Sequence, residues 1–304
     1  MPRKAATIFN EKGINVRLAA YEERGVSRIG IVSDDGKSIR PLDVDGMDAN
    51  AGVLPLITAQ IPLTDLARKA GAPQPLDCVR LRAPVPRPSR NVFCVGRNYH
   101  EHANELSGSI FKDSKDGEAW PIIFSKVPES VVGPTDDVRL PTGISSDIDY
   151  EAELCVVIGK QGKNIARADA LAHIYGYTIV NDVTARDVQQ RHRQWHLGKS
   201  FDTFCPMGPW IVTADELDAG NIDIRCLVNG EVRQSANTRD LIFDIGTIIE
   251  NCSRGITLYP GDVIATGTPA GVGLGMDPPC FLKDGDVVRV EIQGIGHIEN
   301  VFKV

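Results

Sequence analysis

The chain has 304 residues, of which 42% are hydrophobic and 24% charged, a balance typical of a soluble globular protein with a sizeable core. Its formal net charge is -7, and it contains no basic run. These features argue against nucleic acid or an anionic membrane as the main partner, so an anionic substrate must be met by local Arg, Lys or metal charge.

The cysteines indicate a reducing compartment. All seven lack a CxxC spacing, and several lie inside apolar stretches, which is typical of buried reduced thiols. The N-terminus lacks the apolar core of a secretory signal, and no segment approaches the roughly 20 apolar residues of a membrane span. We therefore expect a cytoplasmic protein.

The first 88 residues predict a small β domain. Short alternating apolar runs between 16 and 42 predict a β-meander, and 62–70 predicts a short helix ended by a glycine. Prolines recur over 73–88, which favours an extended connector. We expect a small N-terminal domain over 1–88 and a second domain over 89–304.

The second domain opens with an apolar strand at 91–99 and a helical turn. His102 and Glu105 lie three residues apart, so the turn places them on one face, within reach of each other. The polar segment 107–119 is either a plain surface loop or a mobile lid over a site. The strand after it ends in Lys126.

An acidic stretch occupies the middle of the chain. In an extended strand Asp147, Asp149, Glu151 and Glu153 would all point to one side of the sheet, because successive side chains alternate. The apolar residues 154–158 that follow predict a strand buried on both faces. The alternative is a solvated strand whose charges discourage edge-to-edge pairing.

A second buried strand strengthens the case for a site. Residues 177–182 end in Asp182, so two strand-borne Glu and one strand-end Asp form an all-oxygen set. Such a set suits Mg²⁺, with Mn²⁺ nearly as good, whereas Ca²⁺ would want more ligands.

Two helices are predicted after the acidic strand. The first covers 166–175, and the second begins at Thr184, whose hydroxyl would cap it with Asp187 three residues on. The second helix displays Arg186 and Gln189 immediately after the strand that ends in Asp182. From spacing alone, Arg186 is equally an exposed helical residue without a function.

The remaining elements are a hairpin, a core helix and a glycine-rich loop. Asn229-Gly230 predicts a two-residue hairpin, and 241–252 predicts an amphipathic helix whose apolar side belongs to the core. In 263–273 three glycines would let backbone N–H groups approach an anion, with Thr266 and Thr268 as hydroxyl donors. The loop matches no phosphate-loop motif, and no dinucleotide-binding motif occurs in the chain.

Together these residues predict an active site. A Mg²⁺ can chelate a 2-oxo acid, while a histidine held by a glutamate can move protons or activate water. A serine nucleophile is disfavoured because no GxSxG motif occurs. The candidates are the carboxylates Glu151, Glu153 and Asp182, the pair His102 and Glu105, and the donors Arg97, Lys126, Arg186, Gln189 and Lys199.

The motifs that carry this chemistry resemble those of the fumarylacetoacetate hydrolase superfamily. The match runs in the right order over roughly residues 90–303. The motifs are CVGRNY at 94–99 with His102, DYEAEL at 149–154, NDVTARDVQ at 181–189, KSF at 199–201 and TGTPAGVG at 266–273.

The resemblance implies a mixed β-sandwich or β-roll catalytic domain, mainly β with some helix, in a homodimer, with a small N-terminal β domain. It implies Mg²⁺ or Mn²⁺ at Glu151, Glu153 and Asp182. It further implies catalytic roles for His102, Glu105 and Lys199, with the first two as a water-activating dyad. Arg186, Gln189 and Thr268 fall at substrate-binding positions, and we add Arg97 and Lys126 by extrapolation.

From the resemblance we predict a metal-dependent hydrolase of a carbon–carbon bond in a 2,4-dioxo acid, of the acylpyruvate or fumarylpyruvate kind, acting through an enolate in aromatic catabolism. An isomerase or decarboxylase of a hydroxy-dienedioate, or an oxaloacetate decarboxylase, is the alternative on the same scaffold. A non-catalytic, metal-stabilised binding module is a remote third possibility.

Overall fold

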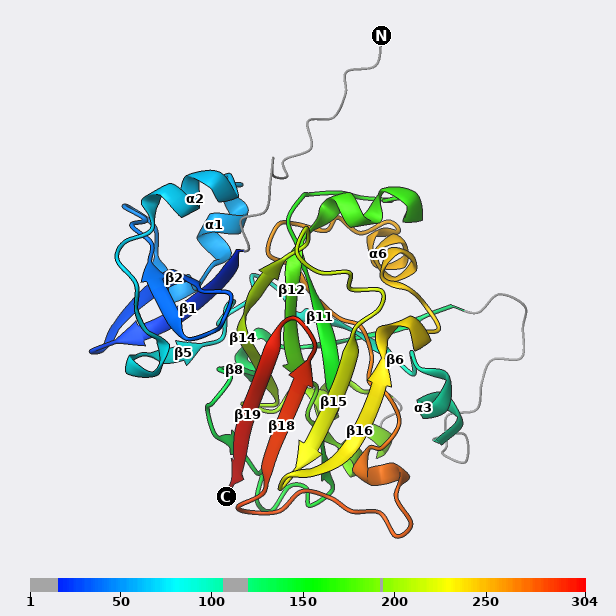
Figure 1. Ribbon diagram of the computed structural model, residues 1–304. Coiled ribbons are helices and arrows are strands. Elements are labelled where there is room, and N and C mark those ends of the chain that lie inside the picture. Colours follow the sequence, from blue (N-terminus) through cyan, green and yellow to red (C-terminus); the bar gives the residue numbers. More distant parts are fainter. Residues whose placement is uncertain (1–15, 106–119, 192–193) are drawn as a thin grey trace.

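The computed structural model describes residues 16–105, 120–191 and 194–304. Within these ranges the chain is mainly β, as predicted, with short helices around two large sheets and a separate two-stranded sheet of β10 and β13 (Figure 1). None of the helices described has the length and apolar character needed to cross a membrane. The predicted loop or lid at 107–119 lies outside the described residues, and so do residues 192 and 193.

Most of the described strands belong to the two sheets. The strands are β1 (Arg17–Glu23), β2 (Val26–Val32), β3 (Ser38–Pro41), β4 (Gln74–Pro75), β5 (Arg80–Arg82), β6 (Val92–Gly96), β7 (Ile122–Lys126), β8 (Val131–Val132), β9 (Val138–Arg139), β10 (Ile148–Asp149), β11 (Ala152–Ile158), β12 (Ile174–Asn181), β13 (Thr184–Ala185), β14 (Cys205–Thr213), β15 (Asp223–Val228), β16 (Glu231–Asn237), β17 (Val263–Ala265), β18 (Val287–Ile292) and β19 (Gly296–Lys303).

The helices are short. The α-helices are α1 (Leu54–Thr58), α2 (Leu63–Lys69), α3 (His100–Glu105), α4 (Arg186–Arg191), α5 (His196–Lys199) and α6 (Ile245–Ser253). The 3-10 helices are η1 (Ala49–Ala51), η2 (Leu76–Cys78), η3 (Pro128–Ser130), η4 (Arg167–His173), η5 (Thr238–Asp240) and η6 (Gly273–Gly275).

The larger sheet has the order β4-β3-β2-β1-β14-β12-β11-β17-β6-β7, with β5 beside β1 and β8 beside β14. Every residue of β11 and β14 is buried, which explains their nearly continuous apolar sequences. Alternate residues of β11 face opposite ways, so Leu154 and Val156 join one core while Cys155 and Val157 join another. The acidic strand is therefore buried on both faces, and the solvated alternative is wrong.

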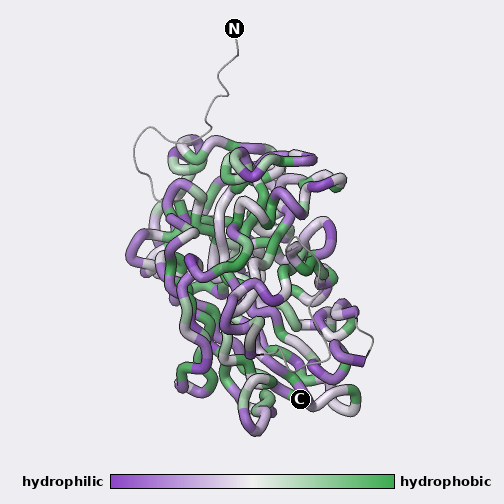
Figure 2. Tube along the Cα trace, turned by 90° about the vertical axis from the view of Figure 1, so that its right-hand side faces the viewer, coloured by the Kyte–Doolittle hydropathy of each residue, from purple (hydrophilic) through white to green (hydrophobic). Residues whose placement is uncertain are grey.

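The second sheet, with the order β16-β15-β18-β19-β9, covers one face of the larger sheet (Figure 1). Its strands alternate between buried and more exposed residues, as in β18, where Val288, Val290 and Ile292 point into the shared core. Figure 2 shows hydrophobic and hydrophilic segments alternating along the trace. The predicted hairpin is confirmed, since Asn229 and Gly230 link β15 to β16 with φ values of 51° and 81°.

The N-terminal elements form a lobe at one end of the larger sheet (Figure 1). The predicted meander is present as β1, β2 and β3, and β1 also pairs with β14 at Arg17 and Leu18. Leu18, Ile29 and Leu56 share a core with residues of β11 and β14. The lobe is thus continuous with the rest of the fold through one strand and one core. Its proposed boundary at residue 88 stays a prediction.

Three local predictions differ from the structure. Residues 167–173 form the 3-10 helix η4, and β12 already begins at Ile174. The helix predicted over 241–252 is α6, which begins only at Ile245 because the Asp244 side chain caps it by accepting from the Thr247 N–H. Thr184 lies in β13 and donates its hydroxyl proton to the carbonyl of Asp182, so it does not cap a helix.

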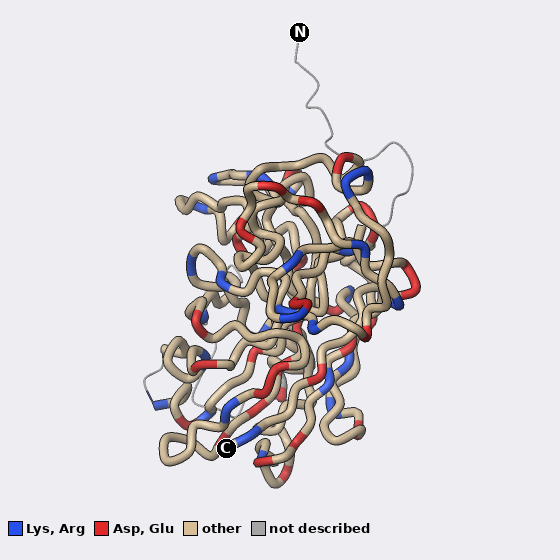
Figure 3. The backbone as a smooth tube through the Cα atoms, turned by 90° about the vertical axis from the view of Figure 1, so that its left-hand side faces the viewer, with Lys and Arg blue, Asp and Glu red and all other residues tan. Residues whose placement is uncertain are grey.

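Charge is spread over the molecule. Figure 3 shows Lys and Arg interspersed with Asp and Glu along the backbone. Many of the ion pairs lie at the surface, where each contributes little to stability. Buried pairs gather around Asp149, Glu151 and Asp182, near the start of β11 and the end of β12.

Candidate active site

Three buried carboxylates meet where β11 begins and β12 ends. One oxygen from each of Glu151, Glu153 and Asp182 lies within 4.8 Å of the others. Antiparallel pairing of β11 with β12 produces this arrangement, since Ala152 lies opposite Asn181 and the Asp182 N–H donates to the Glu151 carbonyl at 2.9 Å. The structure therefore brings together all three predicted metal ligands. An all-oxygen set of this kind fits a hard divalent cation such as Mg²⁺.

The acidic row is interrupted, contrary to the prediction that four carboxylates line one face. Strand β10 ends at Asp149 and β11 begins only at Ala152, so the alternation is not continuous. Asp149 accepts from the Arg186 Nε–H at 2.8 Å and from the Gly273 and Leu274 N–H groups. Asp149 thus organises the surroundings of the site instead of joining the ligands.

Electrostatics support a cation at the three carboxylates. Burial raises the pKa of Glu153 well above its usual range, and the charges of Asp182 and Glu151 raise it further. Burial also opposes ionisation of Glu151, but Lys199 and Arg186 outweigh it and lower the pKa of that carboxyl to about 2. A divalent cation would offset the burial and the neighbouring negative charges that raise the pKa of Glu153, so the residues present fit such an ion.

Two buried lysines contact the ligands from different sides. Lys199 donates from Nζ to Glu151 at 2.7 Å and to Asp182 at 2.8 Å. Lys126 donates to the other oxygen of Asp182 at 2.6 Å and to the carbonyl of Val183 at 3.1 Å. Lys199 lines the pocket, whereas Lys126 lies outside the lining residues. This position favours a role for Lys126 behind the ligands, and its substrate-binding role stays a prediction.

Arg186 extends from α4 into the site and is only 2% exposed. Its Nη1 donates to Glu151 at 2.8 Å and to the Gln189 amide oxygen at 3.2 Å, while Nε binds Asp149. The remaining nitrogen, Nη2, is buried and has no hydrogen-bond partner among the residues described. Arg186 is therefore a buried residue of the site and not an exposed helical arginine. Its spare N–H groups suit an oxygen of a bound anion.

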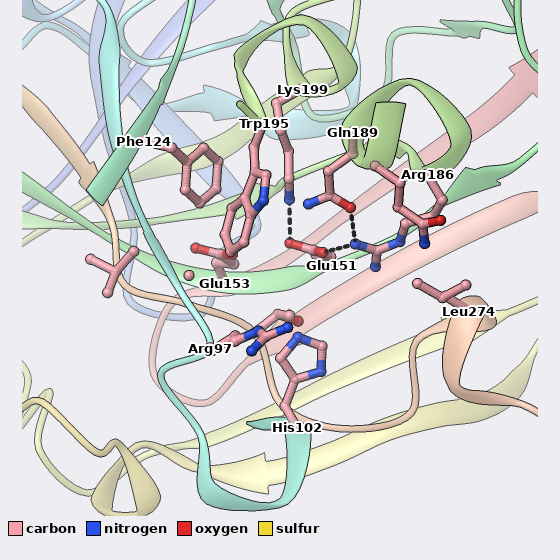
Figure 4. A pocket seen from close by; sticks show the side chains of 14 residues that line it. Arg97, His102, Phe124, Glu151, Glu153, Arg186, Gln189, Trp195, Lys199 and Leu274 are labelled. Atoms are coloured by element: carbon pink, nitrogen blue, oxygen red, sulfur yellow. Dashed lines mark hydrogen bonds and ion pairs between the residues drawn. The ribbon is translucent and has the colours of Figure 1, made fainter. Parts of the chain in front are cut away.

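His102 and Glu105 form the predicted pair on α3. His102 Nδ1 lies 3.1 Å from one Glu105 oxygen, and the other Glu105 oxygen accepts from the Gly271 N–H at 3.1 Å. A Cβ at Gly275 would lie 2.1 Å from that second oxygen, so glycine makes room for the carboxylate. The His102 ring faces Glu151 across the pocket (Figure 4). Held in this way, the imidazole can accept and return a proton.

The loop from Thr266 to Leu274 forms one wall of the site. Its Gly267 N–H donates to Glu153 at 2.8 Å, and its Gly271 carbonyl accepts from the Tyr150 hydroxyl at 2.8 Å. The predicted substrate-binding residue Thr268 is 3% exposed and lines the pocket. The glycines do not cradle a free anion as predicted from sequence, because their N–H groups bind Glu153, Glu105 and Asp149.

The pocket also has walls that the sequence did not predict (Figure 4). The rings of Phe124 and Trp195 meet edge to face, with their centroids 5.1 Å apart. A Cβ at Gly96 would lie 2.1 Å from the Trp195 ring, so only glycine at this position leaves room for the ring. Arg97, in the left-handed region at φ 53°, lines the pocket, and its substrate-binding role stays a prediction. The lining residues without an earlier prediction are Val95, Gly96, Phe124, Gln190, Trp195 and Leu274.

A signal for these walls is hard to find in the sequence. Trp195 lies four residues before Lys199, and its ring meets β7, a strand about 70 residues earlier in the chain. Aromatic residues near a motif are usually part of the core, so only the three-dimensional pairing identifies Phe124 and Trp195 as pocket walls.

Residues 91–303 match the family model described as fumarylacetoacetate (FAA) hydrolase C-terminal. The oxaloacetate tautomerase YisK of Bacillus subtilis is 47% identical over 223 residues, which cover 73% of this chain and 72% of YisK. The human mitochondrial oxaloacetate tautomerase FAHD2A is 50% identical over 242 residues, covering 77% of this chain and 74% of the relative.

Solved structures give the same picture of the fold. A fumarylacetoacetate hydrolase from Exiguobacterium antarcticum superposes with a TM-score of 0.84 at 41% identity, covering 95% of this chain and 99% of that one. A 2-hydroxyhepta-2,4-diene-1,7-dioate isomerase from Mycobacterium marinum gives 0.74 at 34% identity, with 95% and 98% covered. A maleylpyruvate hydrolase from Sphingobium gives 0.76 at 33% identity, with 94% and 99% covered.

Proposed function

The chain belongs to the fumarylacetoacetate hydrolase family, and on that premise we propose that it is a divalent-cation-dependent tautomerase that interconverts the keto and enol forms of a short 2-oxo dicarboxylic acid such as oxaloacetate. This reaction moves one proton between C3 and the 2-oxo oxygen and breaks no carbon–carbon bond. It lies closer to the isomerase alternative than to the hydrolase predicted from the sequence.

The observation that carries the proposal is the Nη2 of Arg186, which has no hydrogen-bond partner in the described ranges and lies beside three buried carboxylates. A cation at the carboxylates and spare guanidinium N–H groups next to them are complementary to a 2-oxo acid, whose oxygens need a positive charge and a planar pair of donors. The names of the two relatives, YisK and FAHD2A, favour oxaloacetate as that acid.

Glu151, Glu153 and Asp182 would hold the cation, for which we propose Mg²⁺ or Mn²⁺. When bound, the ion supplies Lewis-acid polarisation of the 2-oxo group, which makes the C3 protons more acidic. Lys199 balances part of the negative charge of the carboxylates through its contacts with Glu151 and Asp182.

The proton transfers fall to His102. Its imidazole takes a proton from C3 of the keto form, and the electron pair of that C–H bond moves into the new C2–C3 double bond. The π electron pair of the C2 carbonyl moves onto its oxygen, which takes the proton back from the His102 imidazolium and gives the enol. Glu105, 3.1 Å from Nδ1, fixes the ring and stabilises its charged form between the two transfers. Arg186 and Gln189 orient the substrate carboxylate meanwhile.

Hydrolysis of a 2,4-dioxo acid is the second candidate. The same His102–Glu105 pair is suited to activating a water that attacks a distal carbonyl, and the Sphingobium maleylpyruvate hydrolase shares the fold. A homodimer, as predicted from the family resemblance, remains part of the proposal. A non-catalytic module would need no histidine–glutamate pair beside the carboxylates.

Isotope exchange separates these functions. The enzyme loaded with Mg²⁺ or Mn²⁺ is mixed with oxaloacetate in D₂O, and exchange at C3 is followed by NMR together with decay of the enol absorbance. Acylpyruvates and a hydroxy-dienedioate are tested in parallel, each with and without chelator. We expect metal-dependent exchange that far exceeds acylpyruvate cleavage. Faster cleavage of an acylpyruvate would support the hydrolase, and no turnover of any acid would refute an enzymatic function.

A further inference from the structure

Gln234 is a buried side chain that belongs to the second sheet and yet reaches the active site. It lies on β16, is 0% exposed and is the partner of Cys226 on β15. Its amide makes three hydrogen bonds to two other parts of the site, namely the start of β11 and the Thr266–Leu274 loop.

The directions of these bonds follow from the partners. The Ala152 N–H can only donate, so the oxygen facing it at 3.0 Å is the amide oxygen of Gln234. The NH₂ group therefore faces the loop, where it donates to the Pro269 carbonyl at 2.7 Å and to Thr268 Oγ1 at 2.7 Å. A carbonyl can only accept, so the contact with Pro269 gives the same orientation independently.

This orientation fixes the polarity of the Thr268 hydroxyl. Because Oγ1 accepts a proton from Gln234, its own proton must point elsewhere. No acceptor for that proton is found among the described residues, and Thr268 lines the pocket. The hydroxyl proton therefore has no acceptor in the described part of the chain and can be donated to a bound ligand.

We infer that Gln234 is a positioning residue that sets the Thr268 hydroxyl as a hydrogen-bond donor to a substrate oxygen. The same amide accepts from the backbone N–H of Ala152, which lies between Glu151 and Glu153. Gln234 therefore connects the Thr266–Leu274 loop to the segment that carries these two carboxylates. The inference rests on the proposed function for the identity of the ligand, a small oxo acid, and not for the geometry.

The decisive variant is Gln234→Glu. It keeps an acceptor for the Ala152 N–H but removes both donors, so the Thr268 hydroxyl turns to donate to the new carboxylate and no longer to the ligand. Oxalate, a planar dianion with the oxygen pattern of a 2-oxo acid, serves as probe in titration calorimetry with Mg²⁺-loaded enzyme. We expect oxalate affinity to fall about tenfold or more, with Mg²⁺ affinity changed by less than about twofold because the acceptor for Ala152 is kept.

A double-mutant cycle tests whether the effect passes through Thr268. Thr268→Val alone should weaken oxalate by a similar factor, and adding Gln234→Glu to Thr268→Val should change it little further. Gln234→Met, which introduces no buried charge, replaces the Glu variant in the same cycle if that protein does not fold. Asn237→Ala is the matched control: it is a buried amide on the same strand that contacts Asp223 and Arg239 instead of the loop. It should lower the melting temperature and leave oxalate affinity unchanged.

Three results would overturn the inference: wild-type oxalate affinity in Gln234→Glu and Gln234→Met, wild-type affinity in Thr268→Val, or an equal loss from the Gln234 change with and without the Thr268 hydroxyl. In kinetics, the inference predicts a higher KM in Gln234→Glu. If oxalate binding behaves as expected and oxaloacetate is not turned over, the proposed function fails and the role of Gln234 stands.

Discussion

Replacing Glu153 by Gln should stabilise the protein in chelator while weakening its hold on a divalent cation. The side chain is 1% exposed, and burial, Asp182 and Glu151 all raise the pKa of its carboxyl. Gln preserves the acceptor for the Gly267 N–H but cannot carry the charge. The substitution therefore removes a repulsive charge and a metal ligand together.

The expected size of the stabilisation follows from proton linkage. A Glu in the unfolded chain ionises near its ordinary pKa of 4.5, while folded Glu153 keeps its proton to higher pH. Between these two values only the unfolded state loses the proton, so the wild-type free energy of unfolding falls by about 1.4 kcal/mol per pH unit through this group. The contribution is fully present below pH 4.5 and is lost as the pH rises through the folded pKa.

The assay is denaturant unfolding of both proteins in EDTA from about pH 5 to about pH 8, where the variant should gain relative to wild type as pH rises. Calorimetry should show that the variant loses more Mg²⁺ affinity than the roughly 10–100-fold lost when a residue that only hydrogen-bonds to a metal ligand is replaced. Other titrating groups largely cancel in the difference between the two proteins. A difference that stays flat with pH would refute the electrostatic reasoning, and wild-type Mg²⁺ affinity would remove Glu153 from the ligand set.

Three further substitutions test the remaining parts of the site. His102→Ala should keep Mg²⁺ and oxalate affinity while kcat falls by about 10² to 10⁴, the usual contribution of general acid–base catalysis; a lower melting temperature with normal kcat would instead indicate a packing role. Arg186→Lys should raise KM for oxaloacetate because a single ammonium cannot replace the planar fork that binds Asp149, Glu151 and an anion, and unchanged steady-state kinetics would place Arg186 outside the substrate contacts. Lys126→Met should lower the free energy of unfolding in EDTA by about 3–5 kcal/mol, the cost of breaking a buried ion pair. The loss should be smaller in Mg²⁺, because the ion would take over part of the charge balance at Asp182. Equal losses in denaturant unfolding with and without Mg²⁺ would show that Lys126 is independent of the metal site.

The sequence determined those parts of the site that depend on short-range geometry. Glu151 and Glu153 are two residues apart, so an extended backbone points both to one side, and the three-residue spacing of His102 and Glu105 brings them together on a helical turn. The Asn229-Gly230 turn likewise follows from the positive φ that these two residues tolerate. In each case the information lies within a few residues, where backbone periodicity alone fixes the relative positions.

Tertiary structure decided the contacts between distant segments. Nothing near Asp149 in the sequence predicts that its carboxylate is bound by Arg186 and by the backbone N–H groups of Gly273 and Leu274. The same holds for the burial of Lys126 against Asp182, 56 residues away. A charged residue gives the same local signal whether it faces solvent or a buried partner, and only the packing of the strands supplies that partner.

Gln234 illustrates the limit most clearly. In the sequence it is one polar residue in a strand at the edge of the second sheet, and its neighbours predict nothing about a site. Packing of that sheet against the larger one places its amide between Ala152 and Thr268, which are 82 and 34 residues away along the chain. Periodicity fixes the side of a strand on which a residue lies, but the partner that it meets there is set by how the two sheets pack across their shared core.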